Sequence, residues 1–182
     1  MIELRFHGRG GQGAVTSAEI VATVAIDEGK YAQAFPSFGP ERRGAPVIAF
    51  ARIDEKQIRD RTAIQSPDVV MVLDPTIMRI VKVAAGLKPD GILVVNTSKD
   101  PDIIRKNTGF KGQLATVNAT TIAMEEIGRA ITNMVLLGAL IKATGMIGPE
   151  GVQTVIEKRF GPMVGGKNIK AFRRALSETR VT

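Results

Sequence analysis

The sequence contains no cysteine, and its single histidine is His7. Without cysteine the chain forms no disulfide and offers no thiolate, and it lacks the usual ligands of iron–sulfur clusters. One histidine is too few for a histidine-rich metal site, and it leaves no histidine elsewhere to act as a catalytic base. We therefore expect no metal site, no iron–sulfur cluster and no catalytic residue in this chain.

Long apolar runs are also absent. No stretch of 18 apolar residues occurs, which argues against a membrane span. The first six residues lack the basic and long apolar regions of a signal peptide. We expect a cytoplasmic chain, and its 182 residues are enough for one ordinary domain over residues 1–182.

Charge is unevenly balanced, with a net charge of +7 and a pI near 10.0. This excess predicts contact with an anion, which is nucleic acid, an acidic protein or a phosphorylated ligand. Aromatic residues make up only 4% and do not alternate with the basic ones, which disfavours a stacking surface for single strands. Residues 158–182 are strongly basic, and they form either a docking surface or a solvated helix face. We expect no nucleic-acid binding, because no recognition motif is present.

Strands and helices alternate along the chain. Residues 2–6 alternate apolar and charged side chains, as a strand does, and Ala14–Glu28 reads as an apolar helix that stops at Gly29. The fold predicted is α/β in three layers, with a mainly parallel sheet, helices on both faces and a Rossmann-like first unit. Further strands are expected at 31–35, 47–53, 68–73, 91–95 and 113–117, and further helices at 76–85, 120–129, 134–144, 150–160 and 168–178.

A glycine-rich loop joins the first strand to the first helix. Gly8, Gly10 and Gly13 fit G-x-G-x-x-G, which allows a tight turn and points helix N–H groups at an anion. A NAD site would need an acidic residue after the second strand, and the sequence has none there. Another phosphorylated ligand and a purely structural turn remain the two readings. The candidate ligand loop comprises Gly8, Arg9, Gly10, Gly11, Gln12 and Gly13.

A second loop carries aromatic, proline and arginine residues. Arginine and aromatic side chains are typical interface anchors, and proline lowers the entropy that is lost on binding. The alternative reading is a surface loop with solvated arginines. The candidate partner interface comprises Phe35, Pro36, Phe38, Glu41, Arg42 and Arg43.

Three more polar residues stand near expected strand ends. We interpret His7 as a histidine whose hydrogen bonds are satisfied at the end of the first strand, rather than as a phosphate ligand. Asp74 and Asn96 follow apolar strands at the edge where open α/β sheets bind ligands. We interpret both as turn and capping residues.

Three segments together resemble one family, the gamma subunits of pyruvate:ferredoxin oxidoreductase and its 2-oxoacid relatives. The three segments are residues 5–14, 29–36 and 41–46. Residues 67–70, 74–75 and 133–139 match the same family in order and spacing. The resemblance covers essentially the whole chain. It implies an enzyme that converts a 2-oxoacid and coenzyme A to acyl-coenzyme A and CO2 and passes electrons to ferredoxin. Pyruvate is the first expectation, although 2-oxoglutarate and branched-chain enzymes have similar gamma subunits.

The resemblance also implies a division of labour. Alpha, beta and delta-type subunits would hold thiamine diphosphate, magnesium and the iron–sulfur clusters, while this chain binds no cofactor alone and has no activity in isolation. It would pack on the thiamine-binding core. Arg9 and the loop N–H groups, helped by Arg42 or Arg43, would hold the phosphates of coenzyme A, or else the loop would only contact a partner. The alternative is a free-standing nucleotide- or phosphate-binding protein that uses the Gly8–Gly13 loop.

Overall fold

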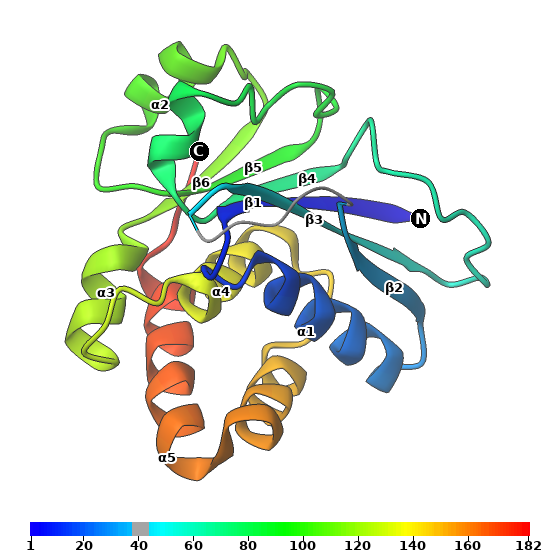
Figure 1. The fold of residues 1–182 in the computed structure, drawn as a ribbon, viewed down its shortest axis with the longest axis vertical. Helices are drawn as coiled ribbons and strands as arrows, with labels where there is room; N and C mark the ends of the chain where they lie inside the picture. Colours follow the sequence, from blue (N-terminus) through cyan, green and yellow to red (C-terminus); the bar gives the residue numbers. More distant parts are fainter. Residues whose placement is uncertain (38–43) are drawn as a thin grey trace.

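The computed structural model describes residues 1–37 and 44–182. The expected interface residues Phe38, Glu41, Arg42 and Arg43 lie outside the described residues. Within them, one sheet has the strand order β2-β3-β1-β4-β5-β6-β7 (Figure 1). Its strands are β1 (Ile2–Arg9), β2 (Tyr31–Pro36), β3 (Pro46–Asp54), β4 (Val69–Val72), β5 (Ile92–Asn96), β6 (Gln113–Val117) and β7 (Arg180–Val181).

The centre of the sheet is parallel. Strands β1, β4, β5 and β6 pair in parallel, whereas β3 is antiparallel to both of its neighbours and β7 is antiparallel to β6. Because β3 runs against both β1 and β2, these two strands point the same way, as in a Rossmann unit. The difference from that unit is that β3 lies between them.

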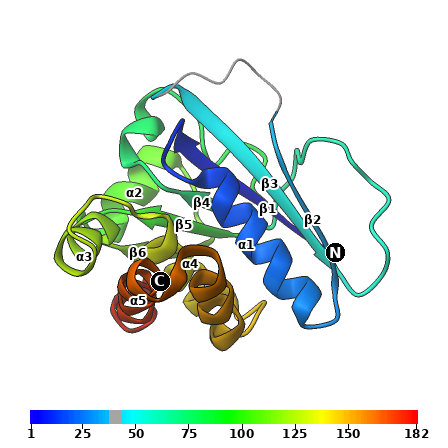
Figure 2. The ribbon, with the colours of Figure 1, turned by 60° about the horizontal axis from the view of Figure 1, so that its bottom comes forward.

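Helices cover both faces, so the prediction of an α/β fold in three layers is confirmed (Figures 1 and 2). One face packs against the larger core, which includes Phe6, Val21 and Phe172. The other face packs against a smaller core that includes Leu93 and Ile104. The first layer is α1 (Ala14–Asp27), α3 (Ala119–Glu126), α4 (Asn133–Thr144) and α5 (Pro149–Glu178), and the second is the 3-10 helix η1 (Pro75–Arg79) and α2 (Pro101–Thr108).

Burial explains why the central elements are apolar on all sides. Every residue of β4 is buried, because helices cover the sheet on both faces at this strand. Helix α4 lies against both the sheet and α5, and a side chain at Gly138 would collide with the carbonyl oxygen of Phe172 in α5. No helix in the described part of the chain is long and apolar enough to cross a membrane.

Some expected boundaries were wrong. The helix expected at 76–85 is the short η1 followed by turns. In these turns the carbonyl groups of Val83 and Ala85 accept hydrogen bonds from the buried guanidinium of Arg5, which ties the segment to β1. Helix α2 and strand β7 were not predicted. The helices expected at 150–160 and 168–178 are two limbs of α5, which bends at Gly161.

Candidate functional site

The parallel strands end together at one edge of the sheet, and polar residues collect there. The Gly8–Gly13 loop begins in the last two residues of β1, Asp74 follows β4, Asn96 ends β5 and Asn118 follows β6. Ligands of open α/β sheets bind at this carboxyl edge. The candidate site is therefore built by loops that are far apart in the sequence.

The glycine loop is a tight turn held on two sides. The N–H of Gly10 donates to the carbonyl oxygen of Ala45 at 2.9 Å, which ties the loop to the start of β3. Gly13 caps α1 in the left-handed region (φ 83°), and a side chain there would collide with the amide of Asn133. The position therefore requires glycine for both its backbone angle and the close approach of α4.

Each nitrogen of the Arg9 guanidinium donates one hydrogen bond to a protein group. Its Nε donates to Oδ2 of Asp74 at 3.0 Å, Nη1 to the carbonyl of Gly44 at 3.0 Å, and Nη2 to Oγ1 of Thr76 at 2.9 Å. Gln12 completes the cluster, because its Nε2 also donates to Oδ2 of Asp74, at 3.0 Å. The Asp74 carboxylate thus balances the charge of Arg9 and occupies the Nε side of its planar fork.

Asp74 is the centre of this cluster. It caps η1, since its Oδ1 accepts from the backbone N–H of Thr76 at 2.8 Å, and this confirms the expected capping role. Partial burial works to raise the pKa of Asp74, but hydrogen bonds from Thr76, Gln12 and Arg9 outweigh it, so the pKa lies below the ordinary value. Asp74 is therefore an ionised structural partner for Arg9 at neutral pH.

A small pocket of about 260 Å³ lies at the N-terminus of α1. The backbone N–H groups of the first turn of a helix favour an anion. The pocket is large enough for a phosphate group. Its lining residues are Arg9, Gly10, Gly11, Gly13, Ala14, Val15, Thr16 and Val47.

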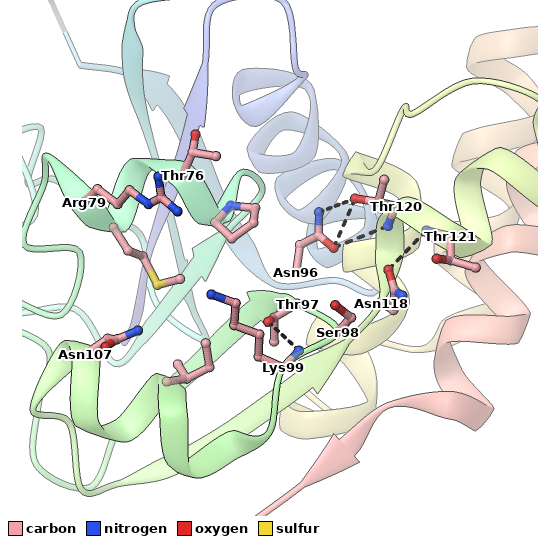
Figure 3. Close-up of a pocket in the computed structure, with 13 residues that line it drawn as sticks. Thr76, Arg79, Asn96, Thr97, Ser98, Lys99, Asn107, Asn118, Thr120 and Thr121 are labelled. Atoms are coloured by element: carbon pink, nitrogen blue, oxygen red, sulfur yellow. Dashed lines mark hydrogen bonds between the residues drawn. The ribbon is translucent and has the colours of Figure 1, made fainter.

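A larger pocket of about 790 Å³ opens beside it, between η1, α2 and the ends of β5 and β6 (Figure 3). Arg79 and Lys99 approach it from opposite sides, and no carboxylate of the described residues lines it. Its volume is in the range of pockets that hold a cofactor-sized ligand. The lining residues are Pro75, Thr76, Met78, Arg79, Asn96, Thr97, Ser98, Lys99, Ile104, Asn107, Asn118, Thr120 and Thr121.

Side-chain hydrogen bonds fix the floor of this pocket. The amide of Asn96 donates to the carbonyl of Leu73 at 3.0 Å and to Oγ1 of Thr120 at 3.0 Å, which links three loops. Asn118 caps α3 by accepting from the N–H of Thr121 at 3.2 Å. The Oδ1 of Asn96 also accepts from the backbone N–H of Thr120 in the first turn of α3 at 3.3 Å, so Asn96 both connects these segments and helps to cap α3, as Figure 3 shows.

Sequence reasoning missed Arg79 and the run Thr97-Ser98-Lys99. The signal was present, because hydroxyl and lysine side chains directly follow the apolar strand Ile92–Asn96. Such residues at the carboxyl end of a parallel strand are typical of phosphate sites. Arg79 carried no comparable signal, because its place depended on the length of η1.

His7 lies on β1 beneath the site and is only 3% exposed. Burial, with the charge of Arg5 as a second cause, lowers the pKa of His7 to about 4, so the ring is neutral at pH 7. Its Nε2 has no hydrogen-bond partner among the described residues. The expectation that its hydrogen bonds are satisfied is therefore wrong for this nitrogen.

Of the expected interface residues, the described ones lie at the end of β2. The centre of the Phe35 ring lies 5.3 Å from the centre of the Phe50 ring and 5.5 Å from the guanidinium of Arg52. Phe35 and Pro36 are both partly buried. Part of the Phe35 surface therefore serves the fold itself.

Residues 3–178 match the family model described as pyruvate ferredoxin/flavodoxin oxidoreductase. The chain belongs to this family. Within it, the protein of Pyrococcus abyssi named "Pyruvate/ketoisovalerate oxidoreductases common subunit gamma" is 56% identical over 182 residues, which are 100% of this chain and 98% of that one. The resemblance found in the sequence is thereby confirmed.

Two solved structures of the oxidoreductase family share the fold. The crystal structure of pyruvate oxidoreductase subunit PORC from Thermotoga maritima is 44% identical with a TM-score of 0.90, covering 100% of this chain and 98% of that one. The keto/oxoacid ferredoxin oxidoreductase gamma subunit of Geobacter sulfurreducens is 27% identical with a TM-score of 0.77, covering 98% of both.

Proposed function

We propose that this chain is the gamma subunit of a multi-subunit pyruvate:ferredoxin oxidoreductase, and that a ketoisovalerate oxidoreductase shares the same subunit. The assignment rests on the end-to-end match with a common gamma subunit, which is 56% identical over 100% of this chain and 98% of its own length. Partners of the alpha, beta and delta types would hold thiamine diphosphate, magnesium and the iron–sulfur clusters. The lack of cysteine supports this division, because the chain has no thiolate to ligate a cluster.

The chain acts in this proposal as one domain in a cytoplasmic enzyme, without activity of its own. One continuous sheet through the described residues supports the single domain. No group of three histidine, cysteine or acidic residues suited to a metal ion occurs in residues 1–37 and 44–182. The thiamine-binding core would pack against the end of the β2–β3 pair, where Phe35 and Pro36 lie.

Co-expression tests the subunit assignment directly. The tagged chain is expressed with the three other subunits, and the purified complex is assayed for pyruvate- and coenzyme A-dependent reduction of ferredoxin. We expect a stable complex whose activity is lost when this chain is omitted. A full-rate complex that forms without this chain would refute the assignment.

Coenzyme A is the proposed ligand of the larger pocket. This substrate is a phosphorylated anion, and Arg79 and Lys99 supply two cations to a pocket whose lining, within residues 1–37 and 44–182, holds no carboxylate. Arg9 reaches the pocket wall through Thr76, so the Gly8–Gly13 loop would shape the site rather than grip the phosphates itself. This assigns the phosphate contact to a different loop from the one that the sequence favoured.

Lys99→Gln in the assembled complex tests this site, with Lys111→Gln as the control because Lys111 is exposed and lies outside the pocket. The loss of one charged contact to a phosphate is expected to raise the KM for coenzyme A about tenfold, with the KM for pyruvate unchanged. An equal KM for coenzyme A in both variants would remove the pocket from the proposal.

A further inference from the structure

Helix α5 bends sharply at Gly161 and Pro162, and we call this bend, residues 157–170, the elbow. Gly161 has φ 72° and ψ 172°, a conformation open almost only to glycine, and Pro162 begins the second limb. The limbs cross closely, since a Cβ at Gly165 would lie 3.1 Å from the Cα of Glu157. Figure 1 shows the elbow at the end of the molecule farthest from the sheet.

The tip of this elbow is apolar and exposed. Met163 is 80% exposed and Val164 is 51% exposed, and Pro162 beside them is exposed as well. Met163 is the most exposed large hydrophobic side chain in the described part of the protein. An apolar tip on a rigid turn loses little entropy on binding, and methionine adapts easily to a partner surface.

Lysines flank the tip. Lys167 and Lys170 follow Met163 by four and seven residues, so these two lysines lie on the same face of the second limb as Met163. Lys158 lies on the first limb. All three lysines are exposed, and none forms an ion pair with another described residue. Glu157 is the single acidic residue between positions 151 and 177.

Two neighbouring arginines do not share this freedom. Arg159 pairs with Glu19 at 2.7 Å, and Arg174 pairs with Glu125 and Glu126 of the α3 end. Arg173 donates to the neutral side chain of Gln153 at 2.6 Å. The three lysines near the apolar tip have neither kind of contact with another described residue.

We propose that this elbow, residues 157–170, docks an acidic electron-acceptor protein that binds reversibly to the assembled oxidoreductase. A permanent subunit contact would bury an extensive apolar face that is poor in charge. The elbow instead offers a small apolar tip flanked by exposed lysines, which is typical of transient redox complexes that charge steers together. The inference rests on the proposed function, because the acceptor binds the complex and not the free chain.

Charge reversal at the elbow tests the docking site. The complex is prepared with Lys167→Glu and Lys170→Glu together, and the same change in charge at Lys106 and Lys111, which are exposed on and after α2, is the control. Rates are measured with an acidic ferredoxin and with a small viologen dye. At low salt we expect the KM for ferredoxin to rise about tenfold in the elbow variant only, with the dye rate unchanged.

A second variant separates the apolar contact from the charge. Met163→Ser is expected to raise the KM for ferredoxin about threefold at both low and high salt, because the lost contact is not screened. Recovery of the wild-type complex is scored first and tests the proposed function alone. Unchanged ferredoxin kinetics in both variants would overturn the docking site, and so would loss of a subunit from the elbow variant, which would make the elbow a subunit contact.

Discussion

His7 is expected to make the stability of this fold depend on pH. In the folded chain burial lowers the pKa of His7 to about 4, whereas the same ring in the unfolded chain titrates near 6.5. Between these values the unfolded chain binds a proton that the folded chain does not. The stabilising contribution is therefore complete above pH 6.5 and is lost as the pH falls towards 4.

The size of the effect follows from the two pKa values. A difference of about 2.5 units is worth about 3 kcal/mol in total at 1.36 kcal/mol per unit. Between pH 7.0 and pH 5.5 the free energy of unfolding should fall by about 1.2 kcal/mol. His7 is the single histidine of the chain, so no other imidazole contributes in this window.

Urea unfolding of the isolated chain at pH 7.0, 6.2 and 5.5 measures this slope, and His7→Gln is the comparison because its side chain stays neutral. We expect the wild type to lose about 1.2 kcal/mol across the window and the variant to lose close to nothing. The two slopes must differ whatever the absolute stability of the variant is. Parallel slopes would refute the reasoning, because they would mean that His7 is protonated as easily in the folded chain as in the unfolded one.

Two further predictions concern packing. Gly13→Ala should destabilise the chain by about 3 kcal/mol, because the methyl group strains a left-handed residue and collides with Asn133. Gly11→Ala should cost about 1 kcal/mol, because only the backbone strain applies there. Equal losses of unfolding free energy in urea would contradict this difference. Arg52→Met should cost about 3 kcal/mol, because Arg52 is 1% exposed and pairs with Glu3 at 2.8 Å. Adding Glu3→Gln should recover part of that loss in the same assay, and a double variant no more stable than Arg52→Met would argue against the pair.

The opening of the fold could be predicted because its determinants are close together in the sequence. The strand Ile2–Arg9, the glycine turn and the helix Ala14–Asp27 follow one another in the sequence. The left-handed backbone angle at the end of this turn is met by Gly13 itself, without a distant partner. Strand β3 was also expected from its alternation. Its antiparallel place between β1 and β2 was not, because strand direction depends on pairing partners that the local pattern does not specify.

Two errors have different causes. Helix α2 has clear signals, since Asp100 caps it, Pro101 begins it and Gly109 ends it in the left-handed region. These signals were overlooked in a polar stretch. The turns that follow η1 had no local signal, because they are held by hydrogen bonds from Arg5, about 80 residues away in the sequence.

Arg9 shows why the site was harder to predict than the fold. Its residue type and its place beside a helix N-terminus indicate affinity for an anion, and the structure supplies one from the chain itself, the carboxylate of Asp74. That partner lies 65 residues away, and its own pattern indicated only a cap before Pro75. Once Arg9 is neutralised, the exposed cations at this edge include Arg79 and Lys99, and the proposed phosphate contact moves to the larger pocket. A cation in a sequence motif therefore indicates a ligand only after the acidic side chains at the same sheet edge have been considered.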